Sequence, residues 1–197
     1  IVGFDYTIIG HAYKCTECTI LNLIAIDNFT VSNFAGSSAS GNQDGFGDTA
    51  KFNLPTGITV DRYENVFVAD KSNNIIRKIY SSGLVETFAG SGEDGSNDGM
   101  GDSASFNAPY DVAADRMGNI YVADYYNHKI RKINPSGLVE TFAGSGSAGS
   151  NDGMGDLATF NGPKGVFIDL DGNVLVADTD NNLIRKITPN GYVTTVA

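Results

Sequence analysis

The sequence predicts an all-β fold of the β-propeller type, and three observations lead to that class. A segment of 54 residues recurs without insertion over 31–84, 85–138 and 139–192, and begins once more at 193–197. Each copy holds four short runs of β-branched or aromatic residues, separated by turn signals that contain Gly, Asn or Pro. Gly also accounts for 24 of the 197 residues, which is typical of a chain with many tight turns. Four antiparallel strands in a repeat of this length indicate a propeller blade, because the coils of a parallel β-helix are shorter.

The four strands of a repeat follow one another in a fixed order. In the first copy we expect them at 57–60, 65–70, 75–79 and 84–88, and the other copies repeat them 54 and 108 residues later. Several of these runs are apolar on both faces, which favours sheets packed between other sheets. The prediction is therefore three four-stranded antiparallel blades. Closed propellers need about four to eight blades, so we expect these three to be part of a larger propeller.

The repeated motif resembles the NHL repeat. It reads Asp-Gly-x-Gly-Asp-x-Ala-x-Phe-Asn-x-Pro, then Asp-x-x-Gly-Asn-(Ile/Val)-x-Val-Ala-Asp-x-x-Asn-x-x-Ile-Arg-Lys-Ile, then Gly-x-Val-x-Thr-Phe-Ala-Gly. It is most similar to the long-repeat form found in bacterial and extracellular multidomain proteins, and it covers residues 31–197. The resemblance implies an NHL-type propeller segment. The first copy departs most, since Tyr63-Glu64 stands at the turn glycine and Ser81 replaces Pro. Residues 1–30 lie outside the resemblance, and we interpret them as the end of a preceding domain or blade.

Every repeat carries an aspartate at the end of its second strand and an arginine seven residues later. If a four-residue hairpin loop joins the second and third strands, the arginine is the diagonal neighbour of the aspartate on the same face of the sheet. We therefore predict one bracing ion pair in each blade. The alternative is a ring of arginines that binds a ligand, but identical recurrence favours the structural role. The three pairs are Asp70 with Arg77, Asp124 with Arg131, and Asp178 with Arg185.

A glycine-rich loop with two aspartates four residues apart precedes the first strand of each repeat. Two carboxylates in such a loop suggest calcium, but the alternate ligands and distal Glu of an EF-hand are absent. The favoured interpretation is that the glycines adopt positive φ and the aspartates cap turns. No metal or other cofactor is expected, and the calcium candidates are Asp98, Asp102, Asp152 and Asp156.

The N-terminal segment contains two features that favour an extracellular protein. Cys15 and Cys18 form a C-x-x-C motif, which we interpret as a structural disulfide or as unpaired structural cysteines, with half of a zinc site or a redox pair as alternatives. Asn28 begins the sequon Asn-Phe-Thr. Together with a low density of charge, these features favour a secreted or cell-surface glycoprotein.

Catalytic patterns are scarce, and the charge limits the classes of partner. The two histidines, His11 and His128, occupy non-equivalent positions, and no Ser/His/Asp arrangement or phosphate loop is present. A net charge of −10 argues against nucleic acid, and no apolar run approaches the roughly 20 residues of a membrane span.

The favoured function is a non-enzymatic scaffold for protein–protein interaction or for self-assembly into a ring or filament. One alternative is a propeller that binds a glycan or another small ligand, with Tyr125, Tyr126 and His128 as the asymmetric candidate cluster. A lyase-like propeller enzyme is the second alternative.

Overall fold

The computed structural model describes residues 6–8, 11–13 and 32–197. The chain divides into two compact units, 1–32 and 33–197, which are described separately. In the first unit, β1 (Tyr6–Ile8) and β2 (His11–Tyr13) pair as an antiparallel hairpin. The predicted features at Cys15, Cys18 and Asn28 lie outside the described residues. No helix in the described part of the chain is long and apolar enough to cross a membrane.

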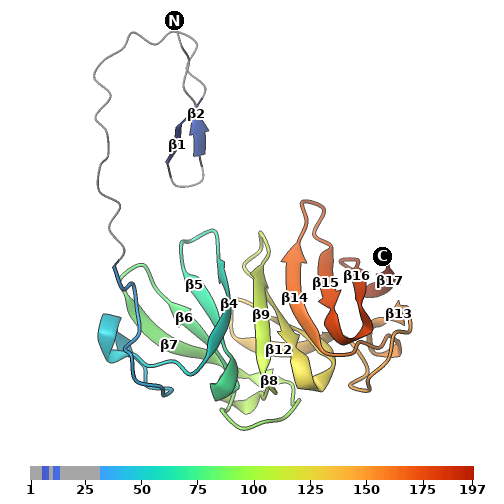
Figure 1. Ribbon diagram of the computed structural model, residues 1–197, viewed down its shortest axis with the longest axis horizontal. Coiled ribbons are helices and arrows are strands. Elements are labelled where there is room, and N and C mark those ends of the chain that lie inside the picture. Colours follow the sequence, from blue (N-terminus) through green and yellow to red (C-terminus); the bar gives the residue numbers. More distant parts are fainter. Residues whose placement is uncertain (1–5, 9–10, 14–31) are drawn as a thin grey trace, which may run out of the picture. The chain divides into compact units, whose positions relative to one another are not determined.

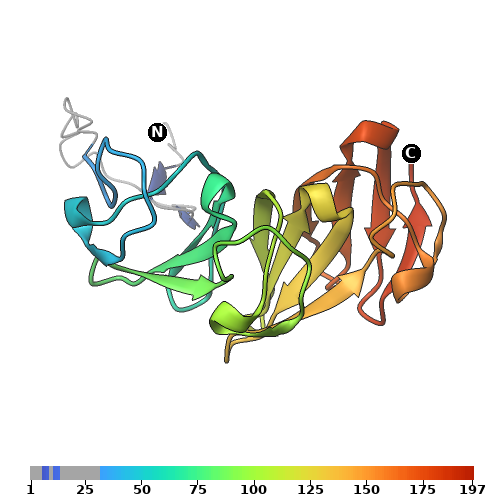
Figure 2. The same ribbon diagram turned by 90° about the horizontal axis from the view of Figure 1, so that it is seen from below.

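The second unit consists of three five-stranded antiparallel sheets that follow one another in chain order (Figures 1 and 2). The first sheet holds β3 (Gly45–Phe46), β4 (Pro55–Val60), β5 (Val66–Asp70), β6 (Ile75–Ile79) and β7 (Leu84–Ala89). The second sheet holds β8 (Gly99–Met100), β9 (Pro109–Ala114), β10 (Ile120–Asp124), β11 (Lys129–Ile133) and β12 (Leu138–Ala143). The third sheet holds β13 (Gly153–Met154), β14 (Pro163–Ile168), β15 (Val174–Asp178), β16 (Leu183–Ile187) and β17 (Tyr192–Thr195).

The prediction of four strands per sheet is wrong, because each sheet has a fifth. The four expected strands form in every repeat, and a two-residue strand from the acidic glycine-rich loop joins the outer edge of the same sheet. In the second sheet, Gly99 pairs with Val139 and Met100 with Leu138. Gly101 follows with a φ of 51°, which turns the chain back towards the innermost strand. The sequence repeat and the sheet are therefore out of phase, and residues 193–195 complete the third sheet as part of β17.

Short 3-10 turns join the strands and recur at equivalent places. Three of them follow the two-residue strands: η1 (Gly47–Thr49), η3 (Gly101–Ser103) and η5 (Gly155–Leu157). Three more join the second and third long strands: η2 (Lys71–Asn73), η4 (Tyr125–Asn127) and η6 (Thr179–Asn181). Each of the latter ends on a left-handed residue, namely Asn74, His128 or Asn182. Left-handed backbone is tolerated best by Asn and a few other non-glycine residues, which explains the Asn at two of these three positions.

The hydrophobic core lies between the sheets. Phe67, Ala69 and Ile76 of the first sheet pack against Val112 and other residues of the second, and a similar cluster joins the second sheet to the third. The innermost strands β4 and β14 both lie beside β9 (Figure 1). The fold thus stacks each sheet on the next, as the apolar character of both strand faces predicted.

Close backbone packing holds the innermost strands together. A Cβ atom on Gly57 would collide with the Cα atom of Asp111, so only glycine fits between β4 and β9 at this point. The Thr56 hydroxyl donates a 2.6 Å hydrogen bond to the Tyr110 carbonyl, and the Val166 N–H donates a 3.0 Å hydrogen bond to the Asp111 carboxylate. The first contact joins Thr56 of β4 to Tyr110 of β9, and the second joins Val166 of β14 to the same strand.

Candidate functional site

A buried arginine links the strands of every sheet to the loop at its outer edge. In the second sheet the Arg131 side chain is fully buried, and its Nη1 atom lies 2.9 Å from Asp124 Oδ2. Nη1 also donates to the Ser105 carbonyl at 3.0 Å, while Nη2 donates to the Asn97 carbonyl at 2.9 Å and lies 2.6 Å from Asp98 Oδ1. Arg77 and Arg185 make the same four kinds of contact in their sheets. The predicted partners are therefore together in all three sheets, and each arginine serves as an internal brace.

Each brace contains a second carboxylate, which the sequence pattern did not predict. The first aspartate of each acidic loop, Asp44, Asp98 or Asp152, binds the arginine of its sheet at 2.6–2.8 Å. Two of the calcium candidates, Asp98 and Asp152, are therefore ligands of arginine, and each also accepts a hydrogen bond from a threonine. The other two, Asp102 and Asp156, lie exposed in η3 and η5. Within the described residues, no group of three or more His, Cys, Asp or Glu side chains could hold a metal ion.

In the second sheet, the pKa values of the two carboxylates of the brace shift in opposite directions. Burial raises the pKa of Asp124, although Arg131, Asn127 and the Asn107 N–H act against it by stabilising the charged form. For Asp98, burial has the same effect, but hydrogen bonds from Thr141 and Arg131 outweigh it and hold its pKa below the ordinary value. Asp98 is therefore an anion at neutral pH, as a permanent partner for an arginine needs to be.

A cluster of aromatic and charged side chains lies at the end of the sheets where the innermost strands begin. Tyr110 begins β9, and η4 supplies Tyr125 and Tyr126, with ring centroids 5.9 Å apart for Tyr110 and Tyr125 and 4.6 Å apart for the two neighbours. Lys71 of η2 and Lys164 of β14 both place their ammonium groups over the Tyr110 ring, 5.0 and 5.7 Å from its centroid. We call Tyr110, Tyr125, Tyr126, Lys71, Lys164 and Asp180 the tyrosine cluster.

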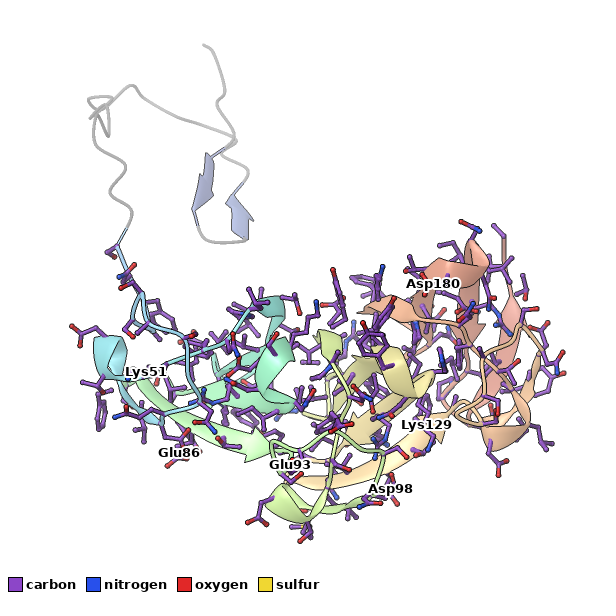
Figure 3. The ribbon with its side chains drawn as sticks, turned by 60° about the horizontal axis from the view of Figure 1, so that its bottom comes forward. Lys51, Glu86, Glu93, Asp98, Lys129 and Asp180 are labelled. Atoms are coloured by element: carbon purple, nitrogen blue, oxygen red, sulfur yellow. The ribbon has the colours of Figure 1, made fainter. Side chains whose placement is uncertain are left out.

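The third sheet completes the tyrosine cluster. The Tyr125 hydroxyl donates a 3.2 Å hydrogen bond to Asp180 Oδ2, and the Lys164 ammonium lies 5.1 Å from the centroid of the Tyr125 ring. Figure 3 labels Asp180 in the third sheet and Asp98 lower in the view. The cluster brings side chains from all three sheets together.

His128, the third member of the predicted ligand cluster, has a different role. It occupies the left-handed position after η4, and its Nδ1 atom accepts a 3.0 Å hydrogen bond from the Gly162 N–H. In the preceding repeat, Asn74 holds the same position, and its side-chain oxygen accepts the equivalent bond from the Ala108 N–H at 2.9 Å. His128 therefore joins the second sheet to the third, and this contact uses one of its two ring nitrogens.

Two hollows lie at the opposite end of the sheets, and of their lining residues only Lys78 in one and Lys132 in the other are equivalent in the repeat. One of about 330 Å³ lies between the first and second sheets and includes Lys78, Tyr80 and Glu86 in its lining. The other, of about 300 Å³, includes Lys132 and Asp169. The Tyr80 hydroxyl donates to Glu86 at 2.9 Å, and Asp169 accepts hydrogen bonds from backbone N–H groups of its own turn. The carboxylates of Glu86 and Asp169 thus already accept hydrogen bonds from nearby residues.

Comparison with known proteins gives both a family and a fold. The family model described as NHL repeat matches residues 106–133, which run from Phe106 through the Asp124–Arg131 pair. NHL repeat-containing protein 2 of Bos taurus is 34% identical over 174 residues, which cover 80% of this chain and 24% of that protein. The chain spans 14% to 24% of the length of the curated relatives that it matches.

Two solved structures from Bacteroides thetaiotaomicron share the arrangement of the sheets. A protein of unknown function has a TM-score of 0.65 and 27% identity, and the match covers 78% of this chain and 38% of that one. An auxiliary nutrient binding protein has a TM-score of 0.58 and 26% identity, and the match covers 70% of this chain and 36% of that one. With three sheets built on one repeated motif and an arginine brace within the matched segment, this chain carries an NHL repeat and is similar to NHL repeat-containing proteins.

Proposed function

We propose that the three sheets are blades of a larger, closed propeller that acts as a non-catalytic scaffold for contacts with other proteins. The observation that carries the proposal is the bare apolar face of the third sheet. Phe167 and Ile184 on this face are 63% and 45% exposed. The residue one repeat before Ile184 is Ile130, and the residue two repeats before it is Ile76, and both are fully buried between sheets. The third sheet therefore exposes to solvent a position that is buried between sheets in the other two repeats.

The first sheet presents the complementary face. Ile58 is 65% exposed, although the equivalent Val112 and Val166 are buried against the preceding sheet. Exposed apolar area of this kind is unfavourable at about 25 cal/mol per Å², and large patches of it on soluble proteins mark interaction sites. A further blade of the same type would cover either face with the packing that already joins the three sheets.

The non-catalytic part of the proposal rests on how the repeated polar groups are used. The arginines, the two aspartates that bind each of them, and the turn carboxylates Asp115 and Asp169 all make internal contacts, so these groups offer the solvent little acid–base chemistry. An extracellular or cell-surface setting remains a proposal that rests on Cys15, Cys18 and Asn28.

Light scattering and the binding of an apolar dye test whether the bare apolar face of the third sheet is a contact surface. The 197-residue chain should associate with itself and bind the dye, and the variant Phe167→Asp/Ile184→Asp should do both less. Leu170→Asp is the matched control, because Leu170 is 83% exposed on a turn outside the face and its replacement should change neither result. A monomeric wild-type chain that binds no dye would contradict the proposal.

A second candidate function is the binding of a small ligand or glycan at the tyrosine cluster. Its support is that three aligned positions, each filled differently in the three repeats, come together in the cluster, and the similarity to a structure described as an auxiliary nutrient binding protein adds to it. Equilibrium dialysis of the chain against a panel of labelled oligosaccharides tests this candidate, and Tyr126→Ala should abolish any binding at the cluster.

A further inference from the structure

The positions that form the tyrosine cluster are the same three positions of each repeat, filled differently every time. Elsewhere, adjacent repeats agree at half or more of their positions. Scaffold contacts keep the repeat symmetry, as the braces do, whereas a ligand that touches several blades at once requires different side chains from each. The three sets are Thr56, Tyr110 and Lys164; Lys71, Tyr125 and Thr179; and Ser72, Tyr126 and Asp180.

The absence of a side chain at Gly162 supports the contact between Tyr125 and Asp180. It has a φ of 58°, and the equivalent Leu54 and Ala108 hold the same backbone conformation with φ of 51° and 52°. Backbone conformation alone therefore does not demand glycine here. A Cβ atom on Gly162 would collide with the Asp180 carboxylate and lie 2.7 Å from Cε2 of Tyr125. The glycine thus makes room for the contact between Tyr125 and Asp180.

The aromatic part of the cluster fits the ring of a sugar. Tyr126 is 61% exposed and packs on Tyr125, so an apolar ring surface faces solvent beside hydroxyl, ammonium and carboxylate groups. Ligand sites commonly combine an aromatic surface, which contacts the apolar part of the ligand, with a few polar groups that fix its orientation. A pyranose has an apolar face and a rim of hydroxyls that match these two features.

The charged part of the cluster selects for an acidic sugar. Lys71 and Lys164 approach one ring from two different sheets, and among the described residues every ion pair involves an arginine rather than either lysine. These ammonium groups are thus available to a carboxylate. Asp180 at the edge of the cluster and the net charge of −10 disfavour a long polyanion such as nucleic acid, but not a short acidic oligosaccharide that places one carboxylate between the two lysines.

We propose that the tyrosine cluster binds a uronic-acid-containing oligosaccharide, with its ring on Tyr126 and its carboxylate between Lys71 and Lys164. This inference rests on the second candidate function and narrows it to one chemical class. The Thr56 hydroxyl, which already donates to the Tyr110 carbonyl, and the Asp180 carboxylate are then in place to accept hydrogen bonds from hydroxyls of the sugar.

Isothermal titration calorimetry with three ligands tests the proposal. Trigalacturonate should bind, its methyl ester should bind at least fivefold more weakly, and glutarate, a dicarboxylate without a sugar ring, should not bind. Lys164→Gln should weaken trigalacturonate binding at least fivefold and leave binding of the ester unchanged. Lys186→Gln, a lysine on β16 outside the cluster, is the matched control and should affect neither. Tyr126→Ala should weaken both ligands, and circular dichroism establishes that each variant is folded.

The other outcomes distinguish failure of the acidic-sugar proposal from failure of the glycan-binding function. If the ester and the acid bind equally and Lys164→Gln has no effect, the acidic-sugar proposal is wrong, while the glycan-binding function stands. Glutarate binding as tightly as trigalacturonate would reduce the site to a simple anion site and overturn the sugar proposal. If none of the carbohydrates tested here or in the panel binds, the second candidate function fails as well, and the scaffold function is unaffected.

Discussion

Arg131 and Asp124 lie on neighbouring strands with both side chains fully removed from solvent, and their charged atoms are 2.9 Å apart. Asp124 pairs in register with Lys129, so Arg131 is its diagonal neighbour on the same face of the sheet. Removal of one partner leaves the other charge buried without compensation, which is far more costly than loss of a surface ion pair.

Arg131→Ala should therefore lower the free energy of unfolding by about 3 kcal/mol. Asp98→Asn is the matched comparison, because the Asp98 side chain is half exposed and an amide oxygen can still accept from the arginine; it should cost less than about 1 kcal/mol. Urea denaturation measures both. Equal losses for the two variants would mean that the inner pair is not the main part of the brace.

Alkaline pH should destabilise the protein through Tyr121. Burial between the second and third sheets, with a smaller effect of Asp115, raises the pKa of Tyr121 to about 12. In the unfolded chain this hydroxyl loses its proton near pH 10, so the unfolded state binds fewer protons than the folded state between pH 10 and about 12. Stability should fall as the pH rises through this window. Tyr121→Phe should show a shallower fall by the same denaturation assay, and an unchanged slope would contradict the assignment.

Gly57→Ala should be among the most destabilising alanine substitutions in the first sheet. The new methyl group would overlap the backbone of Asp111 on β9, which can move only if β4 and β9 separate. We expect a loss of about 2–3 kcal/mol in unfolding free energy. Gly165→Ala is the control, because its methyl group would meet only the Cβ atom of Ala177, at 3.2 Å. A smaller loss for Gly57 than for Gly165 would be incompatible with the packing of the innermost strands.

His128→Asn should leave the unfolding free energy unchanged to within about 0.5 kcal/mol. Asparagine fills the equivalent left-handed positions in the other two repeats, and Asn74 accepts the same inter-sheet hydrogen bond. His128→Ala loses both the acceptor and the tolerance for this backbone, so it should cost about 1–2 kcal/mol. Thermal unfolding compares the two. A large loss in the asparagine variant would show that the imidazole has a role beyond this bond.

The long strands and the inner ion pair could be predicted because both depend on local sequence. Asp124 and Arg131 are seven residues apart, and the hairpin fixes their register. Asp98 and Arg131 are 33 residues apart, and the two-residue strand that brings them together is too short to show any alternation of polar and apolar residues. Most members of the tyrosine cluster are likewise far apart in the sequence. Adjacency in sequence grouped His128 with Tyr125 and Tyr126, whereas Lys71, Lys164 and Asp180 come from other repeats. These positions differ among the aligned repeats, but so do several positions outside the cluster, so the repeat pattern alone does not single them out.

The two-residue strands protect the outer edges of the sheets. An uncovered edge strand offers unpaired N–H and carbonyl groups to the strand of any other chain, which is a common route to aggregation. In the first sheet, β3 satisfies part of that edge along β7, and the pair between Asp44 and Arg77 anchors the acidic loop from which β3 comes. The arginine in the interior of each sheet thus also helps to keep the sheet from extending into a neighbouring molecule.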